Sequence, residues 1–178
     1  MAFELLKSEI VYQGRAVTLR SDTLRLPDGR ETKVDIVAHV GSVVILPLDA
    51  NGHLLFVRQY RHAAGLELLE LPAGTFDEDE TPEACAMREV REETGMAAGR
   101  LTALGGFYLA PGYSTEYMYV YLATELRYDP LEADADEFLS VEQVPLAEVM
   151  AMFEGGEIPD AKSLAAFLLA REHLEKRK

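Results

Sequence analysis

The stretch Gly74–Met96, with the sequence GTFDEDETPEACAMREVREETGM, decides the fold that we predict for the rest of the chain. It carries start and stop signals of a helix. Thr81 is suited to cap the first turn, Pro82 suits the first helical position, and Gly95 suits the residue that follows a helix. The stretch therefore predicts a helix that begins after Thr81 and ends at Gly95.

The predicted helix carries acidic residues in a spacing that suits metal binding. Glu89, Glu92 and Glu93 stand at i, i+3 and i+4, so three carboxylates share one face of the helix. Like charges that close repel one another, whereas a hard divalent cation turns the cluster into a site, because Mg²⁺ takes oxygen ligands. The opposite face is predicted to reach the core through Ala84, Met87 and Val90.

An acidic run is more often a solvated helix face than a binding site. Two features favour a site here. Arg88 lies one turn before Glu92, where an arginine orients a carboxylate, and Glu80 precedes the helix close to the turn-prone segment Leu71–Gly74. An arginine and a loop thus accompany the acids, and we interpret the stretch as a metal-binding site.

Composition limits the classes of protein to consider. The 178 residues, 48% of them hydrophobic, suit one domain with a small appendage and a real core. No run approaches about 18 apolar residues, so no membrane span is predicted. The first ten residues, MAFELLKSEI, lack a secretory pattern and the single cysteine, Cys85, excludes an intramolecular disulfide, so we expect a cytoplasmic protein.

The formal net charge of −14 argues against a nucleic-acid partner, because a polyanion would be repelled and no basic stripe reverses the charge. A small phosphorylated substrate is compatible with it, since bound cations and a few local arginines neutralise phosphates. The charge also keeps a protein of this size soluble, whatever its function.

Short strands are predicted over most of the remaining chain. Residues 3–40 are predicted to form three strands with a turn at Pro27-Asp28-Gly29, and residues 41–58 a β-hairpin through Asn51-Gly52. Further strands are predicted at 66–71, 101–110, 116–126 and 138–144, an acidic loop at 128–137, and helices at about 146–154 and 160–177.

This order of elements predicts an α/β (α+β) sandwich, in which a mixed sheet lies between helices. We divide the chain into an N-terminal antiparallel β unit, residues 1–40, and a main domain, residues 41–178. The β unit is too small to bury much by itself, so it packs on the main domain or on another subunit. We expect the second arrangement, a homodimer.

The stretch resembles the Nudix box: glycine, five residues, Glu, seven residues, then Arg-Glu-hydrophobic-x-Glu-Glu-x-Gly-hydrophobic. Every defined position is met, at Gly74, Glu80, Arg88, Glu89, Val90, Glu92, Glu93, Gly95 and Met96. The resemblance implies a Nudix-type α/β/α sandwich. It also implies hydrolysis of a nucleoside diphosphate derivative, by attack of water on the pyrophosphate with two to three Mg²⁺ or Mn²⁺ ions.

The resemblance assigns roles within the box. Glu89 and Glu93 are expected as direct metal ligands and Glu92 as a ligand or a water-mediated partner, with the carbonyl group of Ala73 as a further ligand. Arg88 is expected to orient the glutamates. These residue types suit the chemistry, since displacement at phosphorus needs a positioned water and neutralised oxygens, which carboxylate-bound metals provide.

The general base is expected outside the box. In similar ADP-ribose hydrolases it comes from an acidic loop after the box, and here that loop contains Glu132, Asp134, Asp136 and Glu137. Glu137 is the first candidate, because it directly precedes the predicted strand at 138–144, and Asp136 is the second. Two interpretations of Glu80 remain open: it supports the metal ligands, or it is an acid at the start of the helix that the helix dipole favours.

Substrate recognition is predicted from a loop after the box. The segment Ala110–Glu116, APGYSTE, resembles the SPG-x-x-x-E loop of ADP-ribose pyrophosphatases, with Ala110 where serine is usual. Pro111, Gly112 and Glu116 are therefore substrate-binding candidates. Glu116 is expected to contact the terminal ribose or an arginine that binds the substrate.

A second resemblance to the same group lies before the box, at Val57–Arg61, VRQYR. Arg61 is the phosphate-binding candidate, because a guanidinium binds phosphate through two hydrogen bonds. Its alternative is an ion pair with Glu70. Glu70 is itself a substrate-binding candidate.

The function we expect is metal-dependent hydrolysis of ADP-ribose to AMP and ribose 5-phosphate. The first alternative is a pyrophosphatase for GDP-mannose or another nucleotide-sugar. The second is a non-catalytic nucleotide-sensing module, against which the intact set of glutamates argues.

Overall fold

Ten strands and three helices form the part of the chain that the computed structural model describes, residues 2–15, 17–132 and 138–175. The elements are β1 Glu4–Gln13, β2 Thr18–Arg25, β3 Glu31–Ala38, β4 Ser42–Pro47, β5 His53–Arg61, β6 Leu66–Glu70, β7 Ala73–Thr75, α1 Pro82–Thr94, β8 Met96–Tyr108, β9 Tyr117–Tyr128, β10 Leu139–Pro145, α2 Leu146–Gly155 and α3 Ala161–Glu175. None of these helices is both long and apolar enough to cross a membrane.

The first compact unit of the chain consists of Met1–Gly41 and Phe107–Tyr117. Strands β1, β2 and β3 follow one another in an antiparallel sheet. The segment Phe107–Tyr117 joins this unit through the backbone of Val37, whose amide donates to the carbonyl of Tyr113 (2.7 Å) and whose carbonyl accepts from the amide of Thr115 (3.1 Å).

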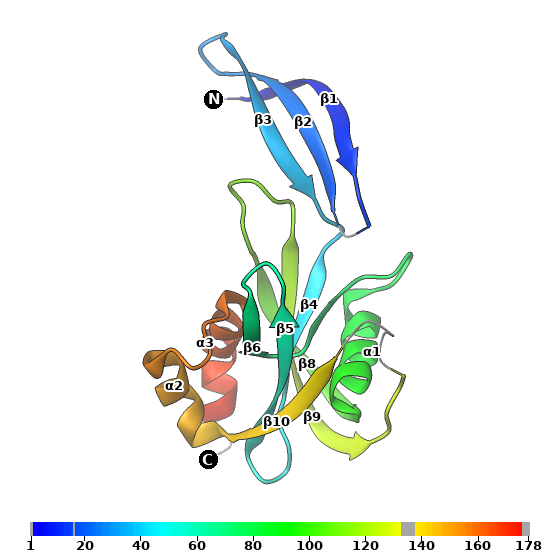
Figure 1. Cartoon of the computed structure of the whole chain (residues 1–178), viewed down its shortest axis with the longest axis vertical. Helices are drawn as coiled ribbons and strands as arrows, with labels where there is room; N and C mark the ends of the chain where they lie inside the picture. Colours follow the sequence, from blue (N-terminus) through cyan, green and yellow to red (C-terminus); the bar gives the residue numbers. More distant parts are fainter. Residues whose placement is uncertain (1, 16, 133–137, 176–178) are drawn as a thin grey trace. The chain divides into compact units, whose positions relative to one another are not determined.

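The second unit, Ser42–Gly106 with Met118–Lys178, holds the main core. It contains a sheet in the order β7-β4-β9-β8 and another in the order β10-β5-β6. The first is mixed, because β4 pairs in parallel with β9 and antiparallel with β7. All residues of β4 are buried, and both α1 and α3 contact it. Figure 1 shows α1 on one side of β4 and the pair α2 and α3 on the other, which confirms the predicted sandwich with a mixed sheet between helices.

The predicted hairpin at residues 41–58 is wrong. The turn at Asn51-Gly52 exists, but β4 and β5 diverge from it into different sheets and share a single bridge, Leu48 to Leu54. Both edges of β4 are taken by β7 and β9, so no edge is left for β5. The turn signal is local and does not specify the sheet to which each strand belongs.

The short strand β7 also departs from the prediction, which left its residues in a turn. Ala73 and Gly74 pair with Val44 and Val43 of β4. The amide of Ile45 donates to the carbonyl of Pro72 at 2.9 Å, which continues the attachment by one residue. The backbone directly before the acidic helix is therefore held against the most buried strand of the protein.

Helix α1 begins and ends where the sequence predicts. The side chain of Thr81 accepts a hydrogen bond from the amide of Ala84 at 3.2 Å, and Gly95 has φ = 72° with its amide bonded to the carbonyl of Arg91. The predicted core face is wrong at Ala84, which is exposed. Its neighbour Cys85 takes the buried position instead.

Candidate active site

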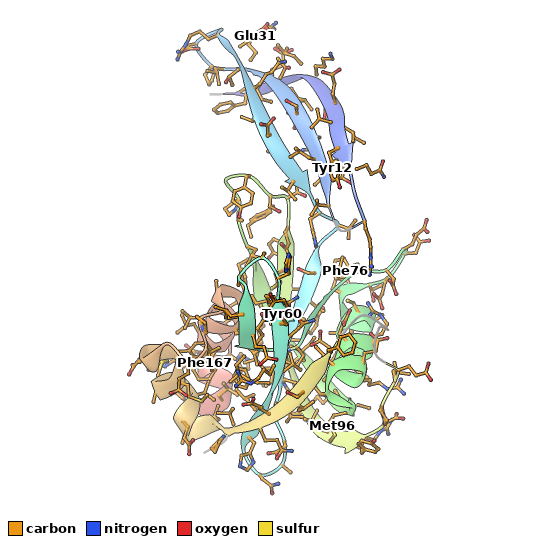
Figure 2. All side chains as sticks on the ribbon, viewed as in Figure 1. Tyr12, Glu31, Tyr60, Phe76, Met96 and Phe167 are labelled. Carbon is orange, nitrogen blue, oxygen red and sulfur yellow. The ribbon has the colours of Figure 1, made fainter. Side chains whose placement is uncertain are left out.

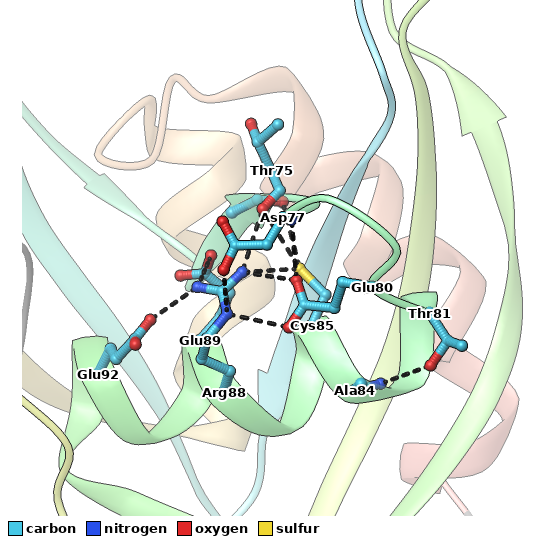
Figure 3. A network of polar contacts seen from close by, with 10 residues as sticks. Thr75, Asp77, Glu80, Thr81, Ala84, Cys85, Arg88, Glu89 and Glu92 are labelled. Carbon is cyan, nitrogen blue, oxygen red and sulfur yellow. Dashed lines mark hydrogen bonds and ion pairs between the residues drawn. The ribbon is translucent and has the colours of Figure 1, made fainter.

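Arg88 of α1 is the centre of a cluster of carboxylates (Figure 3). Its Nε and Nη2 donate to the two carboxylate oxygens of Glu80, at 3.0 and 2.8 Å. Its Nη1 donates to Glu89 at 2.7 Å and to Glu92 at 2.8 Å. One guanidinium thus donates hydrogen bonds to three carboxylates and forms a longer ion pair with a fourth, Asp77, at 3.6 Å. The hydrogen bonds to Glu80 are the largest cause that raises the pKa of Arg88.

Glu80 lies before the helix and supports the cluster from the loop. It accepts from Arg88 and also from the amide of Asp77, at 3.1 Å. The hydrogen bond from Arg88 lowers the pKa of Glu80 below the ordinary 4.5, so Glu80 is charged at neutral pH. The contact with Arg88 gives Glu80 a structural role that goes beyond an acid near the helix start.

Gly74 and Glu89 are fitted to one another. A Cβ added to Gly74 would lie 1.8 Å from a carboxylate oxygen of Glu89, so the carboxylate occupies the space where any other residue would carry its side chain. Glu89 is also largely buried, with 8% of its surface exposed. The glycine is therefore required by the close approach of an acid that Arg88 holds in place.

Glu93 faces the same backbone segment from the next turn of α1. Its carboxylate accepts a hydrogen bond from the amide of Ala73 at 3.2 Å, and the residue is 6% exposed. Glu89 and Glu93 thus contact neighbouring residues of β7, which is itself paired with β4. The structure places these two acids on the inner side of α1, with Glu92 less buried.

A polar cavity of about 390 Å³ lies against this cluster in the second unit. Its walls are formed by Arg61, Ala73, Gly74, Thr75, Phe76, Asp77, Arg88, Glu89 and Glu92. Three acids and two arginines among these residues leave the lining with a net negative charge. An anionic ligand would therefore need a cation to enter.

Arg61, at the end of β5, forms a two-point ion pair with Glu70, at the end of β6. The Nε donates to one carboxylate oxygen at 2.9 Å and the Nη2 to the other at 2.7 Å. Burial acts to raise the pKa of Glu70, but the hydrogen bonds from Arg61 and the charge of Lys162 outweigh it and hold the pKa below 4.5. The ion pair predicted as the alternative for Arg61 exists, and the same arginine lines the cavity.

Comparison with known proteins shows the family to which the chain belongs. The profile of the NUDIX domain matches residues 38–167. The chain belongs to the Nudix family. Its Nudix box is the segment from β7 through α1 that surrounds Arg88.

Two relatives share nearly the whole chain. The ADP-ribose pyrophosphatase of Bacillus subtilis (strain 168) is 36% identical over 174 residues, which are 96% of this chain and 94% of that protein. The ADP-ribose pyrophosphatase of Mycobacterium tuberculosis (strain ATCC 25618 / H37Rv) is 39% identical over 169 residues, 93% of this chain and 82% of that one. A crystal structure of an ADP compounds hydrolase superposes with a TM-score of 0.90 at 28% identity and covers 99% of this chain and 96% of its own.

The donor set of the Nudix box fits a divalent cation. Among residues 2–15, 17–132 and 138–175, no three acidic, histidine or cysteine side chains form a ready-made metal site. Arg88 donates to one oxygen of Glu89, and the amide of Ala73 donates to one oxygen of Glu93. Mg²⁺ is usually held by one or two carboxylates together with substrate phosphates, so it does not need three preformed side chains. Glu89 and Glu92 line the cavity, and Glu93 contacts the same backbone segment as Glu89, so the box offers three carboxylates from which such a pair can come.

The predicted substrate loop belongs to the first unit. Pro111 and Gly112 lie in the turn that follows Ala110, whose carbonyl accepts from the amides of Tyr113 and Ser114. The carbonyl of Glu116 accepts a hydrogen bond from the amide of Leu109 (3.2 Å), and the amide of Glu116 donates to the Ser114 hydroxyl at 3.1 Å. The two candidates for the base, Asp136 and Glu137, lie outside the described residues.

Sequence reasoning missed three residues next to Glu70. Lys162 donates to the carboxylate of Glu70 and to Asp160, and Ser163 accepts from the amide of Leu71. Asp160 directly before a helix is a capping signal, but it does not indicate which strand the helix start will contact. A lysine in the first turn of a helix is usually solvated, so Lys162 had no distinguishing signal.

Proposed function

We propose that the protein is an ADP-ribose pyrophosphatase, which hydrolyses ADP-ribose to AMP and ribose 5-phosphate with Mg²⁺ or Mn²⁺. The identity of the substrate in this proposal rests on the similarity to two ADP-ribose pyrophosphatases over at least 93% of this chain. Both units fall within these alignments, so the similarity is not limited to the Nudix box that the whole family shares.

The metal-binding part of the proposal uses the inner acids of α1. Glu89 and Glu93 hold the ions, with Glu92 as a further ligand or water-mediated partner and the carbonyl of Ala73 as a backbone ligand. Bound metal ions supply charge neutralisation for the phosphates and lower the pKa of a bound water. Arg88 keeps the carboxylates apart and oriented through the hydrogen bonds in Figure 3. We propose two to three ions per site.

The substrate lies with its pyrophosphate against Arg61, which lines the cavity. Pro111, Gly112 and Glu116 contribute to recognition of the remainder of the substrate. A water oxygen forms a bond to one phosphorus as the bond from that phosphorus to the bridging oxygen breaks. Glu137 or Asp136 accepts the proton of the water, and the two phosphate-bearing products leave.

An assay with a substrate panel tests the proposal. ADP-ribose, GDP-mannose, NADH, FAD and diadenosine polyphosphates are incubated with the protein and Mg²⁺, and the products are separated by chromatography. We expect AMP and ribose 5-phosphate from ADP-ribose at the highest kcat/KM. A preference for GDP-mannose would assign the protein to the nucleotide-sugar alternative, and no turnover of any substrate would refute the enzymatic proposal.

We also propose that the N-terminal β unit joins two copies of the chain. Its first strand, β1, carries several exposed apolar side chains, among them Leu5, Ile10, Val11 and Tyr12, each more than half exposed. Figure 2 shows Tyr12 at its place on this sheet. Sedimentation at micromolar concentration should give the mass of a homodimer, and a fully active monomer would contradict this proposal.

A further inference from the structure

Lys162 is a buried lysine that the proposed reaction does not use. It lies in the first turn of α3, and only 10% of its side chain is exposed. Its ammonium group donates to the carboxylate of Glu70 and, at 2.9 Å, to that of Asp160. Lysines are rarely buried without such partners, so these contacts define the position of the ammonium group.

Glu70 connects this lysine to the candidate active site. Its side chain is 2% exposed, and the Arg61 side chain bonded to it is 42% exposed and lines the cavity. A two-point pair requires the carboxylate and the guanidinium to share a plane. The orientation of the Glu70 carboxylate therefore sets the orientation of Arg61, and Lys162 binds the carboxylate oxygen that also accepts from Arg61 Nη2.

The start of α3 is itself anchored to the same backbone. Asp160 caps the helix by accepting from the amide of Ser163 at 3.0 Å. The Ser163 hydroxyl accepts from the amide of Leu71 at 2.7 Å, and the pairs Lys162–Glu70 and Ser163–Leu71 each join residues 92 positions apart. Two consecutive residues of α3 thus hold Glu70, the last residue of β6, and Leu71, which follows it.

We propose that Lys162 is a positioning residue, which acts through Glu70 to hold the Arg61 guanidinium in the orientation that binds the diphosphate of the substrate. The identity of the ligand as a diphosphate rests on the proposed function. The pair with Glu70 uses two of the five N–H groups of the guanidinium, and others bind phosphate oxygens. In this proposal Lys162 affects the affinity for the substrate, and it contacts neither the substrate nor the metal ions itself.

The kinetic consequence follows from the part of the substrate that Arg61 contacts. A phosphate contact that is equally strong in the bound substrate and the transition state contributes to KM and leaves kcat unchanged. We therefore expect Lys162→Met to raise KM for ADP-ribose by about tenfold and to change kcat by less than about twofold. Arg171→Met is the matched control, because Arg171 lies on the same helix and pairs with Glu175 in solvent.

A double-mutant cycle tests whether Lys162 acts through Glu70. Glu70→Gln alone should raise KM at least as much as Lys162→Met, and adding Lys162→Met to it should change KM by less than about twofold. A full additional tenfold increase would show that Lys162 acts by another route. If Lys162→Met does not fold, Lys162→Gln replaces it, since its polar side chain ends one atom short of the ammonium position. An unchanged KM in the folded variant overturns the proposal.

A measurement without substrate separates this inference from the proposed function. The ¹⁵N Nε–H resonance of Arg61, assigned by its loss in Arg61→Lys, reports the hydrogen bond to Glu70. We expect its exchange with water to be at least about tenfold faster in Lys162→Met than in the wild type and unchanged in Arg171→Met. Faster exchange in a protein that does not hydrolyse ADP-ribose would refute the proposed function alone. Unchanged exchange would refute the positioning role even in an active enzyme.

Discussion

Gly74→Ala should inactivate the protein while leaving it folded. The added carbon would lie 1.8 Å from the carboxylate oxygen of Glu89, and real contacts of this kind are not shorter than 3.0 Å, so the oxygen must move by about 1.2 Å. A displacement of about 1 Å in a catalytic constellation costs about 100-fold in rate, and we expect a loss of kcat of that order.

The effect on stability should be much smaller. The displaced Glu89 loses its hydrogen bond from Arg88, which costs about 2 kcal/mol for a bond between charged groups. The lower flexibility of alanine in the unfolded chain recovers about 0.5 to 1 kcal/mol. The net loss of about 1 kcal/mol in the free energy of unfolding leaves most of the protein folded at 25 °C.

Steady-state turnover of ADP-ribose at saturating Mg²⁺, together with urea unfolding, measures both quantities. Gly155→Ala is the matched control, because its added carbon meets only a carboxylate oxygen of Glu157, at an ordinary 3.5 Å, and its position in α2 favours alanine. The control should keep the wild-type kcat and gain slight stability. A Gly74→Ala protein with kcat within about threefold of the wild type would show that the close approach of Glu89 to Gly74 does not position this carboxylate for the reaction.

Four further predictions concern the acids and their arginine. Glu93→Gln should abolish most turnover, because an amide is a poorer metal ligand than a carboxylate. The circular dichroism spectrum should change little, because the amide oxygen of the glutamine still accepts the hydrogen bond from the backbone of β7. Retained turnover would reject Glu93 as a metal ligand. Arg88→Met should lower the free energy of unfolding, measured with urea, by about 3 kcal/mol, because three carboxylates lose the guanidinium that they share. Millimolar Mg²⁺ should restore part of the lost stability. A variant as stable as the wild type would contradict this prediction. The lowered pKa of Glu80 stabilises the folded state above pH 4.5, and this stabilisation is lost as the pH falls through the pKa of Glu80 in the folded protein. Glu80→Gln should therefore show a smaller fall in Tm than the wild type between pH 7 and about pH 3. Parallel curves of Tm against pH for the two proteins would contradict this prediction. Of the two candidates for the base, Glu137→Gln should reduce kcat by at least about 100-fold and Asp136→Asn by less; equal, mild effects would exclude both.

Local signals predicted those parts of the structure that neighbouring residues determine. The capping threonine and the glycine after the helix define α1 within a few residues of sequence, and the order of strands and helices predicts the sandwich. The spacing of the box glutamates also predicts that they share one face of the helix. These features depend on contacts within about two turns, which a single sequence contains.

Features that depend on distant residues were missed. Nothing near Asn51-Gly52 indicates that β4 is already paired on both edges, so the turn was interpreted as a hairpin. The three residues of β7 are too few for a strand pattern. Lys162 and Glu70 are separated by 92 positions, and although Glu70 was a candidate for binding the substrate or Arg61, nothing in the sequence connects it with Lys162. The contact depends on where the start of α3 meets the end of β6, which sequence alone does not specify.

The parallel pairing of β4 with β9 has a consequence for the order in which the chain folds. Strands β1 to β3 pair with neighbours in the sequence, so their sheet can form early during synthesis on the ribosome. Strand β4 can pair with β7 earlier, but it cannot complete its place in the sheet until residues 118–123 have been made, because its parallel partner is 76 positions away. Until then the edge of β4 that takes β9 in the folded protein is unpaired, and its apolar residues, Val43 to Leu46, are not fully covered, which is the kind of segment that chaperones bind.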